Sequence, residues 1–252
     1  MSLNDRSLRE TERVATFRAA ACASGPSADE YKGLRIHALT GLHAFAANWF
    51  TESVRRGATT LELASGSGAM ALRLQDAGYN VTATDLVSEN FRLHGSIPFK
   101  PINLDQDFAS LVGPEFDAIV ALEIIEHLEN PRHFLRQCHQ ALKKGGLLLL
   151  STPNVDNPVS KALFARFGTH LWFDDDRYAK DGHITPVSSW QLAKSADETG
   201  FSFVGRKTFG DPYRHTASWP KLRWFARLIQ LVTTQPASMN GEILLALLQK
   251  TE

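Results

Sequence analysis

The segment from Leu61 to Gly68, which reads Leu-Glu-Leu-Ala-Ser-Gly-Ser-Gly, constrains the fold of this chain more than any other segment. A short apolar run is followed there by a turn of small residues. Small residues do not screen the backbone N–H groups, so a charged, nucleoside-bearing ligand can approach the main chain of such a turn. The segment therefore predicts a nucleoside site at the end of a buried strand.

The rest of the chain supplies a β-α rhythm from Thr59 to about Ser151, which predicts a largely parallel sheet with helices on both faces. The expected strands are 59–63, 80–84, 99–104, 116–121, 146–151, 201–207 and 242–249. The expected helices are 69–77, 131–144, 188–199 and 219–232, with two or three more before the sheet. The chain from 164 to 185 is expected to be an irregular lid.

Composition narrows the class of protein. A chain of 252 residues that is 43% hydrophobic can bury the core of one α/β domain. Its 27 basic residues balance its 27 acidic residues, which disfavours nucleic acid as a partner. Cys22 and Cys138 fit no disulfide or zinc pattern, and the sequence shows neither a signal peptide nor a membrane-spanning apolar run. We therefore expect a cytoplasmic protein.

Asp85 adds a second element of the nucleoside site. It lies 19 residues after Gly66, at the end of the next predicted strand, where a carboxylate can accept hydrogen bonds from both ribose hydroxyls. Gly66 to Ala71 also satisfies the dinucleotide fingerprint G-x-G-x-x-G/A, so an NAD(P)-dependent oxidoreductase is an alternative. Glu62 argues against that alternative, because dinucleotide folds place an apolar residue at this point of the strand.

Four segments follow one another in a familiar order: Glu62 to Gly68, Asp85, Phe116 to Leu128 and Lys144 to Asn154. Together they resemble the class I S-adenosylmethionine-dependent methyltransferases over about residues 58–205. The resemblance is strongest to the group of ubiquinone-biosynthesis O-methyltransferases and bacterial sugar or polysaccharide methyltransferases. It implies a Rossmann-like, seven-stranded, mostly parallel sheet with a C-terminal antiparallel strand. It also implies S-adenosylmethionine as cofactor and S-adenosylhomocysteine as product.

On this resemblance the chain is a single methyltransferase domain with four parts. They are an N-terminal helical cap (1–57), the cofactor-binding core (58–155), a lid or acceptor segment (156–187) and a C-terminal part (188–252) with a helical insertion at about 211–240.

The resemblance implies that Glu62 organises the turn, that Asp85 binds the ribose and that Asn103 or Asp105 lies near the adenine. The cofactor-binding set that it implies is Glu62, Ala64, Ser65, Gly66, Gly68, Asp85, Leu86, Asn103, Leu104, Leu122 and Glu123. Ala64 departs from the family, which usually has glycine there. Because alanine tolerates a left-handed backbone poorly, we expect either a slightly different turn or a lower cofactor affinity, with binding retained.

A hydroxyl acceptor needs a base, and histidine suits this role because its pKa lies near neutrality. His183 is the first candidate, since it lies on the side where the family binds acceptors, and His127 is the second. A divalent metal held by Glu123, Glu126, His127 and His183 is an alternative, as in metal-assisted relatives. The Glu-His-Leu sequence that includes His127 is also common in this superfamily without a metal.

The predicted reaction is O-methylation of a small-molecule, sugar or lipid-linked acceptor by direct in-line transfer. A metal-assisted RNA 2′-O-methyltransferase is a further alternative. The predicted helix at 219–232 has a wide apolar face and a narrow basic stripe. Such a helix fits core packing, a homodimer contact or peripheral contact with an anionic membrane.

Overall fold

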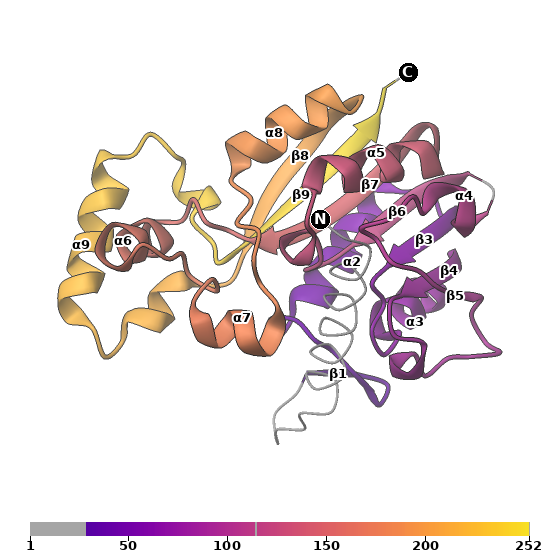
Figure 1. Ribbon diagram of the computed structural model, residues 1–252, viewed down its shortest axis with the longest axis horizontal. Helices are drawn as coiled ribbons and strands as arrows, with labels where there is room; N and C mark the ends of the chain where they lie inside the picture. Colours follow the sequence, from indigo (N-terminus) through magenta and orange to yellow (C-terminus); the bar gives the residue numbers. More distant parts are fainter. Residues whose placement is uncertain (1–28, 114, 252) are drawn as a thin grey trace, which may run out of the picture.

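A seven-stranded sheet forms the centre of the molecule in the computed structural model, which describes residues 29–113 and 115–251 (Figure 1). The strand order is β5-β4-β3-β6-β7-β9-β8. Only β9 runs antiparallel to its neighbours β7 and β8, and the other pairs are parallel. The predicted fold class is therefore confirmed. The strands are β3 (Thr59–Leu63), β4 (Asn80–Asp85), β5 (Phe99–Pro101), β6 (Phe116–Ala121), β7 (Leu142–Pro153), β8 (Phe201–Phe209) and β9 (Ile243–Lys250).

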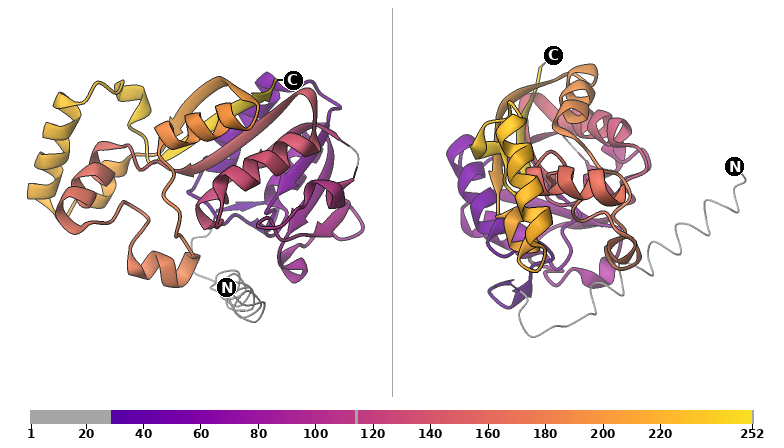
Figure 2. Two further views of the ribbon diagram at one scale, coloured as in Figure 1. Left: turned by 45° about the horizontal axis from the view of Figure 1, so that its top comes forward. Right: turned by 90° about the vertical axis from the view of Figure 1, so that its left-hand side faces the viewer.

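Helices cover both faces of this sheet, as the views in Figure 2 show. Helices α2 (Leu42–Ser53) and α3 (Ala69–Asp76) share one core with Val120, whereas α5 (Pro131–Ala141) and α8 (Ser189–Glu198) share the other core with Ile119. Val120 and Ile119 are adjacent in β6, and successive side chains of a strand point to opposite faces. A strand that is apolar on both faces must be covered on both, and this accounts for the two helical layers.

The start of α5 follows from its sequence, but its end does not. Asn130 caps the helix by accepting a hydrogen bond from the His133 N–H at 3.0 Å, and Pro131 occupies the first turn, as predicted. The helix was expected to continue to Lys144, and this was wrong, because β7 begins at Leu142. Leu142 is fully buried and pairs with Phe116 of β6, so tertiary pairing overrides the local preference for helix.

The strand expected over 99–104 is also shorter than predicted, because β5 ends at Pro101. The chain then turns at Asn103, whose Oδ1 accepts a hydrogen bond from the Asp105 N–H at 3.0 Å. A side chain that bonds the backbone two residues later competes with the sheet ladder, and the strand stops.

The regions outside the sheet differ most from expectation. Of the helical cap expected over 1–57, residues 1–28 lie outside the described part, and the remainder holds α2 together with an unpredicted hairpin of β1 (Glu30–Tyr31) and β2 (Leu34–Arg35). The lid was expected to be irregular over 164–185, but it contains α6 (Pro158–Phe167) and α7 (Asp175–Asp181).

The remaining elements include the predicted helix at 219–232, which is present as α9 (Pro220–Val232). The shorter ones are α4 (Ala109–Val112), η1 (Ser88–Asn90), η2 (Ile125–His127), η3 (Pro212–Thr216) and η4 (Ala237–Met239). Helices α6 and α9 pack on each other to one side of the sheet, and we call residues 157–173 and 212–241 the α6–α9 lobe (Figure 1). Among the described residues, no helix is long and apolar enough to span a bilayer.

Candidate active site

The candidate site lies where the connections from the sheet diverge. From β3 the chain continues outward through β4 and β5, and it then returns to β6 on the other side of β3. Ligands of open α/β sheets bind at such a switch point, beyond the carboxyl ends of the strands. Leu63 pairs with Ala121, so the segments that follow β3 and β6 leave the sheet side by side.

The turn after β3 is held by the end of β4. Asp85 accepts a hydrogen bond from the Gly66 N–H at 2.7 Å through Oδ2 and another from the Val87 N–H at 2.9 Å through Oδ1. The Ser65 N–H donates to the Thr84 carbonyl at 2.8 Å. These bonds fix the path of residues 64–68 before any ligand binds.

Ala64 itself adopts the left-handed backbone that its sequence made doubtful. Its φ is 57°, compared with 52° for Gly66 and 90° for Gly68. A left-handed conformation costs an L-residue with a Cβ roughly 1–2 kcal/mol relative to the right-handed one. The turn therefore retains its left-handed conformation at Ala64, and the backbone of this residue is strained.

Two carboxyl groups lie under this turn. Burial, followed by the negative charge of Asp85, raises the pKa of Glu62 well above its usual value, while the Ala71 N–H opposes this shift. Burial also raises the pKa of Asp85. The backbone hydrogen bonds from Val87, Gly66 and Leu86 oppose this rise. Glu62 Oε2 is buried without a hydrogen-bond partner in the described part of the chain.

The other predicted cofactor residues occupy the rim of the same edge. Leu86 and Leu122 are partly buried directly after β4 and β6. Asn103 follows β5, and its side chain bonds to the Asp105 backbone. Leu104 is only 7% exposed and belongs to the hydrophobic core on the α5 side. Packing alone therefore accounts for Leu104.

The segment before α2, which includes the β1–β2 hairpin, also reaches the turn. Ser67 Oγ donates a hydrogen bond to the Arg35 carbonyl at 2.6 Å. The ring of His37 lies 3.8 Å from the point where a Cβ on Gly66 would stand. The sequence placed the segment from Tyr31 to His43 before the sheet, but no motif in it indicated which residues approach the turn.

Glu123 follows β6 in a left-handed conformation with φ of 50°. Its N–H donates to Ser151 Oγ at 3.0 Å, and the Ser151 hydroxyl donates to Glu123 Oε1 at 2.7 Å. Burial raises the pKa of Glu123 to about 7; the Ser151 hydrogen bond lowers it, and the charge of Glu242 raises it further. The Glu123 N–H also donates to the Ser151 carbonyl at 3.2 Å, so both the backbone and the side chain of Glu123 are attached to the end of β7.

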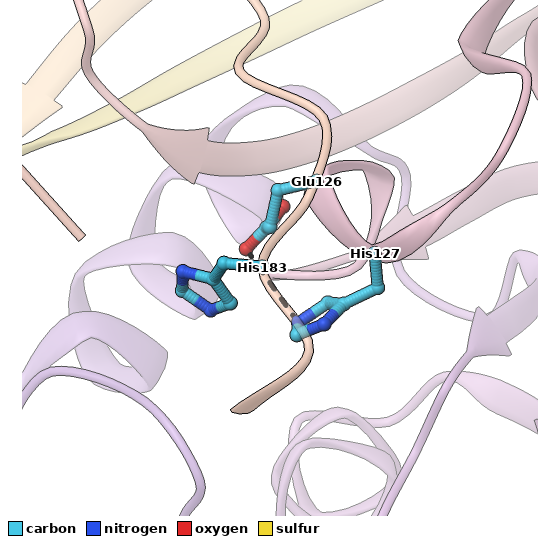
Figure 3. Close-up of side chains that lie close together, drawn as sticks. All are labelled: Glu126, His127 and His183. Carbon is cyan, nitrogen blue, oxygen red and sulfur yellow. Dashed lines mark ion pairs between the residues drawn. The ribbon is translucent and has the colours of Figure 1, made fainter. Parts of the chain in front are cut away.

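Glu126, His127 and His183 point toward one another, as Figure 3 shows. One potential ligand atom from each lies within 4.8 Å of those of the other two. The rings of His127 and His183 pack edge to face with centroids 4.7 Å apart. The N–H groups of Ile184 and Thr185 donate to the Glu126 carbonyl at 3.2 and 2.9 Å, and this brings His183 beside a segment almost sixty positions earlier.

The tautomer of His183 follows from its contact with Trp172. Nδ1 of His183 lies 2.8 Å from the Trp172 carbonyl, which can only accept a hydrogen bond. The proton of the neutral ring is therefore on Nδ1, and Nε2 carries the lone pair. Burial lowers the pKa of His183, so the neutral form is favoured.

Glu126 is the most deeply buried member of this group, with no exposed surface. Burial and the charge of Glu123 raise the pKa of its carboxyl well above the usual value. Its Oε1 lies 4.0 Å from His127 Nε2, and neither oxygen has a hydrogen-bond partner within residues 29–113 and 115–251. Of the four predicted metal ligands, the structure brings these three together, while the carboxylate of Glu123 is held by Ser151 instead.

Comparison with known proteins identifies the family. A family model described as a methyltransferase domain matches residues 31–205. The chain belongs to the S-adenosylmethionine-dependent methyltransferases. Its relatives include the ubiquinone biosynthesis O-methyltransferase of Caulobacter vibrioides, 32% identical over 106 residues that cover 39% of this chain and 42% of that protein. The enzyme of the same name from Pseudomonas paraeruginosa is 29% identical over 164 residues, 62% of this chain and 67% of that protein. The chain thus spans about two fifths of the Caulobacter relative that it matches.

Solved structures confirm the fold of this methyltransferase. An S-adenosylmethionine-dependent methyltransferase from Mesorhizobium loti aligns with a TM-score of 0.54 and 18% identity, over 82% of this chain and 99% of that one. The [4+2]-cyclase SpnF aligns with a TM-score of 0.58 and 13% identity, over 96% and 94%. A protein named as a cyclase and one named as a methyltransferase share this fold. The chemistry of this methyltransferase must therefore be argued from its own residues.

Proposed function

We propose that this protein transfers the methyl group of S-adenosylmethionine to a hydroxyl oxygen of a small-molecule, sugar or lipid-linked acceptor. The observation that carries the proposal is His183, whose Nδ1 is occupied by the Trp172 carbonyl so that Nε2 can accept a proton. Relatives named as ubiquinone biosynthesis O-methyltransferases support oxygen as the acceptor atom.

In the proposed reaction one part of the site binds the cofactor, and the other, His183, accepts the proton of the acceptor. Asp85 and the turn from Ala64 to Gly68 hold the cofactor, and this orients the sulfonium methyl group. As the new bond from the acceptor oxygen to the methyl carbon forms, the carbon–sulfur bond breaks, and its electron pair stays on the sulfur of S-adenosylhomocysteine. His183 Nε2 takes the hydroxyl proton. Alignment of the acceptor oxygen with the methyl carbon and the sulfur supplies most of the rate enhancement. The base contributes a further factor of about a hundred to ten thousand.

The cofactor is tested first by thermal shift with purified protein. A ligand that binds only the folded state raises the melting temperature, so we expect stabilisation by S-adenosylhomocysteine and none by NAD. Stabilisation by NAD alone would favour the oxidoreductase alternative. The acceptor is then sought by transfer of a labelled methyl group to a panel of phenols, sugars and lipid-linked intermediates. Cofactor binding with no transfer to any member would leave a binding protein as the better description.

A metal-assisted variant of the same reaction is the second candidate, and the buried carboxylate of Glu126 favours it. One carboxylate and two imidazoles suit a divalent transition metal, so the residues present fit such an ion. Glu126, His127 and His183 would hold it. A bound metal would act as a Lewis acid that lowers the pKa of the acceptor hydroxyl. His183 Nε2 would then be a ligand, so the two roles of His183 exclude each other.

Chelation separates the two candidates. If His183 acts as the base, activity should survive dialysis against a strong chelator, and metal analysis should find no bound ion. If the ion is needed, activity should fall on dialysis and return when Mg²⁺, Mn²⁺ or Zn²⁺ is added. Glu126→Gln is an independent test, because it should abolish metal binding. The backbone bonds from Ile184 and Thr185 to the carbonyl of residue 126 should keep His183 in position.

A further inference from the structure

Helix α9 has one covered apolar face. Leu222 and Ala226 are 6% and 0% exposed and pack against Val159 and Ala162 of α6. Ile229 packs against the same cluster. These three residues of α9 recur at spacings of four and three, so they form a single narrow stripe along the helix.

A second apolar face of α9 is exposed. Trp224, Leu228 and Leu231 recur at the same helical spacing on the opposite side and are 67%, 40% and 82% exposed. Phe225 (36% exposed) and Val232 (74%) widen this surface, whereas Trp219 (47%) precedes the helix and its ring lies against Phe167 of α6. Exposed apolar residues are ordinary when they are scattered, but a contiguous group of this kind indicates an interaction surface.

The same lobe is strongly basic. Residues 157–173 and 212–241 contain no Asp or Glu, although the whole chain has equal numbers of acidic and basic residues. The lobe carries Lys161, Arg166, Arg214, Lys221, Arg223 and Arg227. Within the described chain only Arg214 of this set makes an ion pair, with Glu242. The positive charge of the other five cations is therefore not neutralised by an ion pair within the described residues.

We propose that the α6–α9 lobe docks on an anionic lipid surface, with α9 lying in the plane of the interface and its exposed apolar face inserted. A basic helix that carries tryptophan and leucine side chains suits this location, since indole rings favour the interface and leucine enters the acyl region. The two faces divide the work: Leu222 and Ala226 attach α9 to α6, and Trp224 and Leu231 enter the lipid.

Other occupants of this surface fit the residues less well. A second copy of the chain would place the cations of one lobe against those of the other, because a two-fold contact brings the same patch of both copies together. Nucleic acid would use the cations and indole rings, but it offers nothing apolar to Leu228, Leu231 and Val232. An anionic bilayer complements both the charge and the aliphatic side chains.

The test is sedimentation of the full chain with lipid vesicles. We expect binding to vesicles of two parts phosphatidylcholine to one part phosphatidylglycerol, and weak binding to phosphatidylcholine alone. The double substitution Trp224→Ser with Leu231→Ser should weaken binding by about tenfold or more, since each removes a large apolar side chain from the interface. The matched control is Trp190→Ser on α8, because Trp190 is 72% exposed but lies outside the lobe, and it should bind as the wild type does.

The charge contribution is tested separately. Arg223→Gln with Arg227→Gln should weaken binding to the anionic vesicles by about thirtyfold, because each basic residue near an anionic surface contributes about fivefold in affinity. Arg136→Gln with Arg206→Gln removes two exposed cations from elsewhere and should have little effect. Hydrogen exchange of the wild-type protein gives a reading that needs no variant: anionic vesicles should slow exchange over 219–232.

Three results would overturn the proposal. The first is wild-type protein that stays in solution with both kinds of vesicle, and the second is unchanged binding by the lobe variants. The third is a wild-type protein that forms a dimer and does not bind vesicles, together with a Trp224→Ser, Leu231→Ser variant that is monomeric. This result would assign the surface to a second copy of the chain. S-adenosylhomocysteine binding is measured on every variant, so failure of the proposed cofactor is distinguished from failure of lipid docking.

Discussion

Two regions of the molecule are built in opposite ways. One is the edge of the sheet at Asp85 and the turn from Ala64 to Gly68, which we call the cofactor edge, and the other is the α6–α9 lobe. At the cofactor edge, β6 is buried on both faces and the polar groups of the turn are bonded to neighbouring strands. In the lobe, the cluster of buried hydrophobic residues is small, with Val159, Ala162, Leu222 and Ala226 at its centre, and much of the apolar surface of α9 is exposed. The cofactor edge therefore holds its own geometry through bonds within the chain, whereas the lobe leaves apolar side chains of α9 exposed, as the proposed lipid docking requires.

The largest expected effect is a loss of turnover when His183 is replaced, compared with no loss when a histidine of the lobe is replaced. His183→Ala should lower turnover of an identified hydroxyl acceptor by about a hundred- to ten-thousandfold, because the base is lost, while S-adenosylhomocysteine affinity is unchanged. His170→Ala is the control, since His170 lies in the lobe, where its ring contacts Ser160 and Phe164. Steady-state kinetics and calorimetric binding measure both variants. Full activity of His183→Ala would show that the assignment of the base is wrong.

Core truncation compares how much each region stabilises the fold. Phe134 of α5 is fully buried, so Phe134→Ala should lower the free energy of unfolding by about 3–5 kcal/mol. Phe225 of α9 is 36% exposed, and Phe225→Ala should lower it by less than about 1 kcal/mol. Urea denaturation measures both. Equal losses would mean that the exposed face of α9 is part of a core after all.

The third prediction concerns cofactor affinity. Asp85→Ala removes the acceptor of the Gly66 N–H and the proposed ribose contact, so S-adenosylhomocysteine should bind about ten- to a hundredfold more weakly in calorimetry. Asp117→Ala is the control, because it also removes a hydrogen-bonded aspartate but at the opposite, amino end of the strands. Asp117 accepts hydrogen bonds from Lys143 and Thr59. Its pKa of about 2, set mainly by Lys143, indicates a structural ion pair. An unchanged affinity for Asp85→Ala would exclude its proposed role.

The smallest expected effect lies in the turn itself. Ala64→Gly removes the Cβ from a left-handed residue and should raise the free energy of unfolding by about 1 kcal/mol, seen as a higher melting temperature in calorimetry. Ala77→Gly is the control, since Ala77 has φ of −76° and glycine there should lower stability by about 0.5–1 kcal/mol. A loss of stability in both variants would show that Ala64 is not strained.

The sequence predicted best where structure is local and periodic. The strand bounds of β3 and β6 and the cap of α5 by Asn130 were all confirmed, because burial period and capping are encoded by neighbouring residues. The end of α5 and the helical content of the lid were not predicted. In these places pairing with a distant strand, or packing on a distant helix, decides between local alternatives of similar energy.

The amino-acid sequence alone therefore determined the class of fold and the edge at which Glu62, Asp85 and the glycine turn meet. Parallel strands end at one edge, and a turn of small residues marks that end, so both can be recognised from nearby residues. Only the tertiary structure decided that Glu126, His127 and His183 converge while Glu123 turns to Ser151, and that α9 buries its narrower face. These outcomes depend on contacts between segments far apart in the chain, and local spacing does not specify which side chains such contacts bring together.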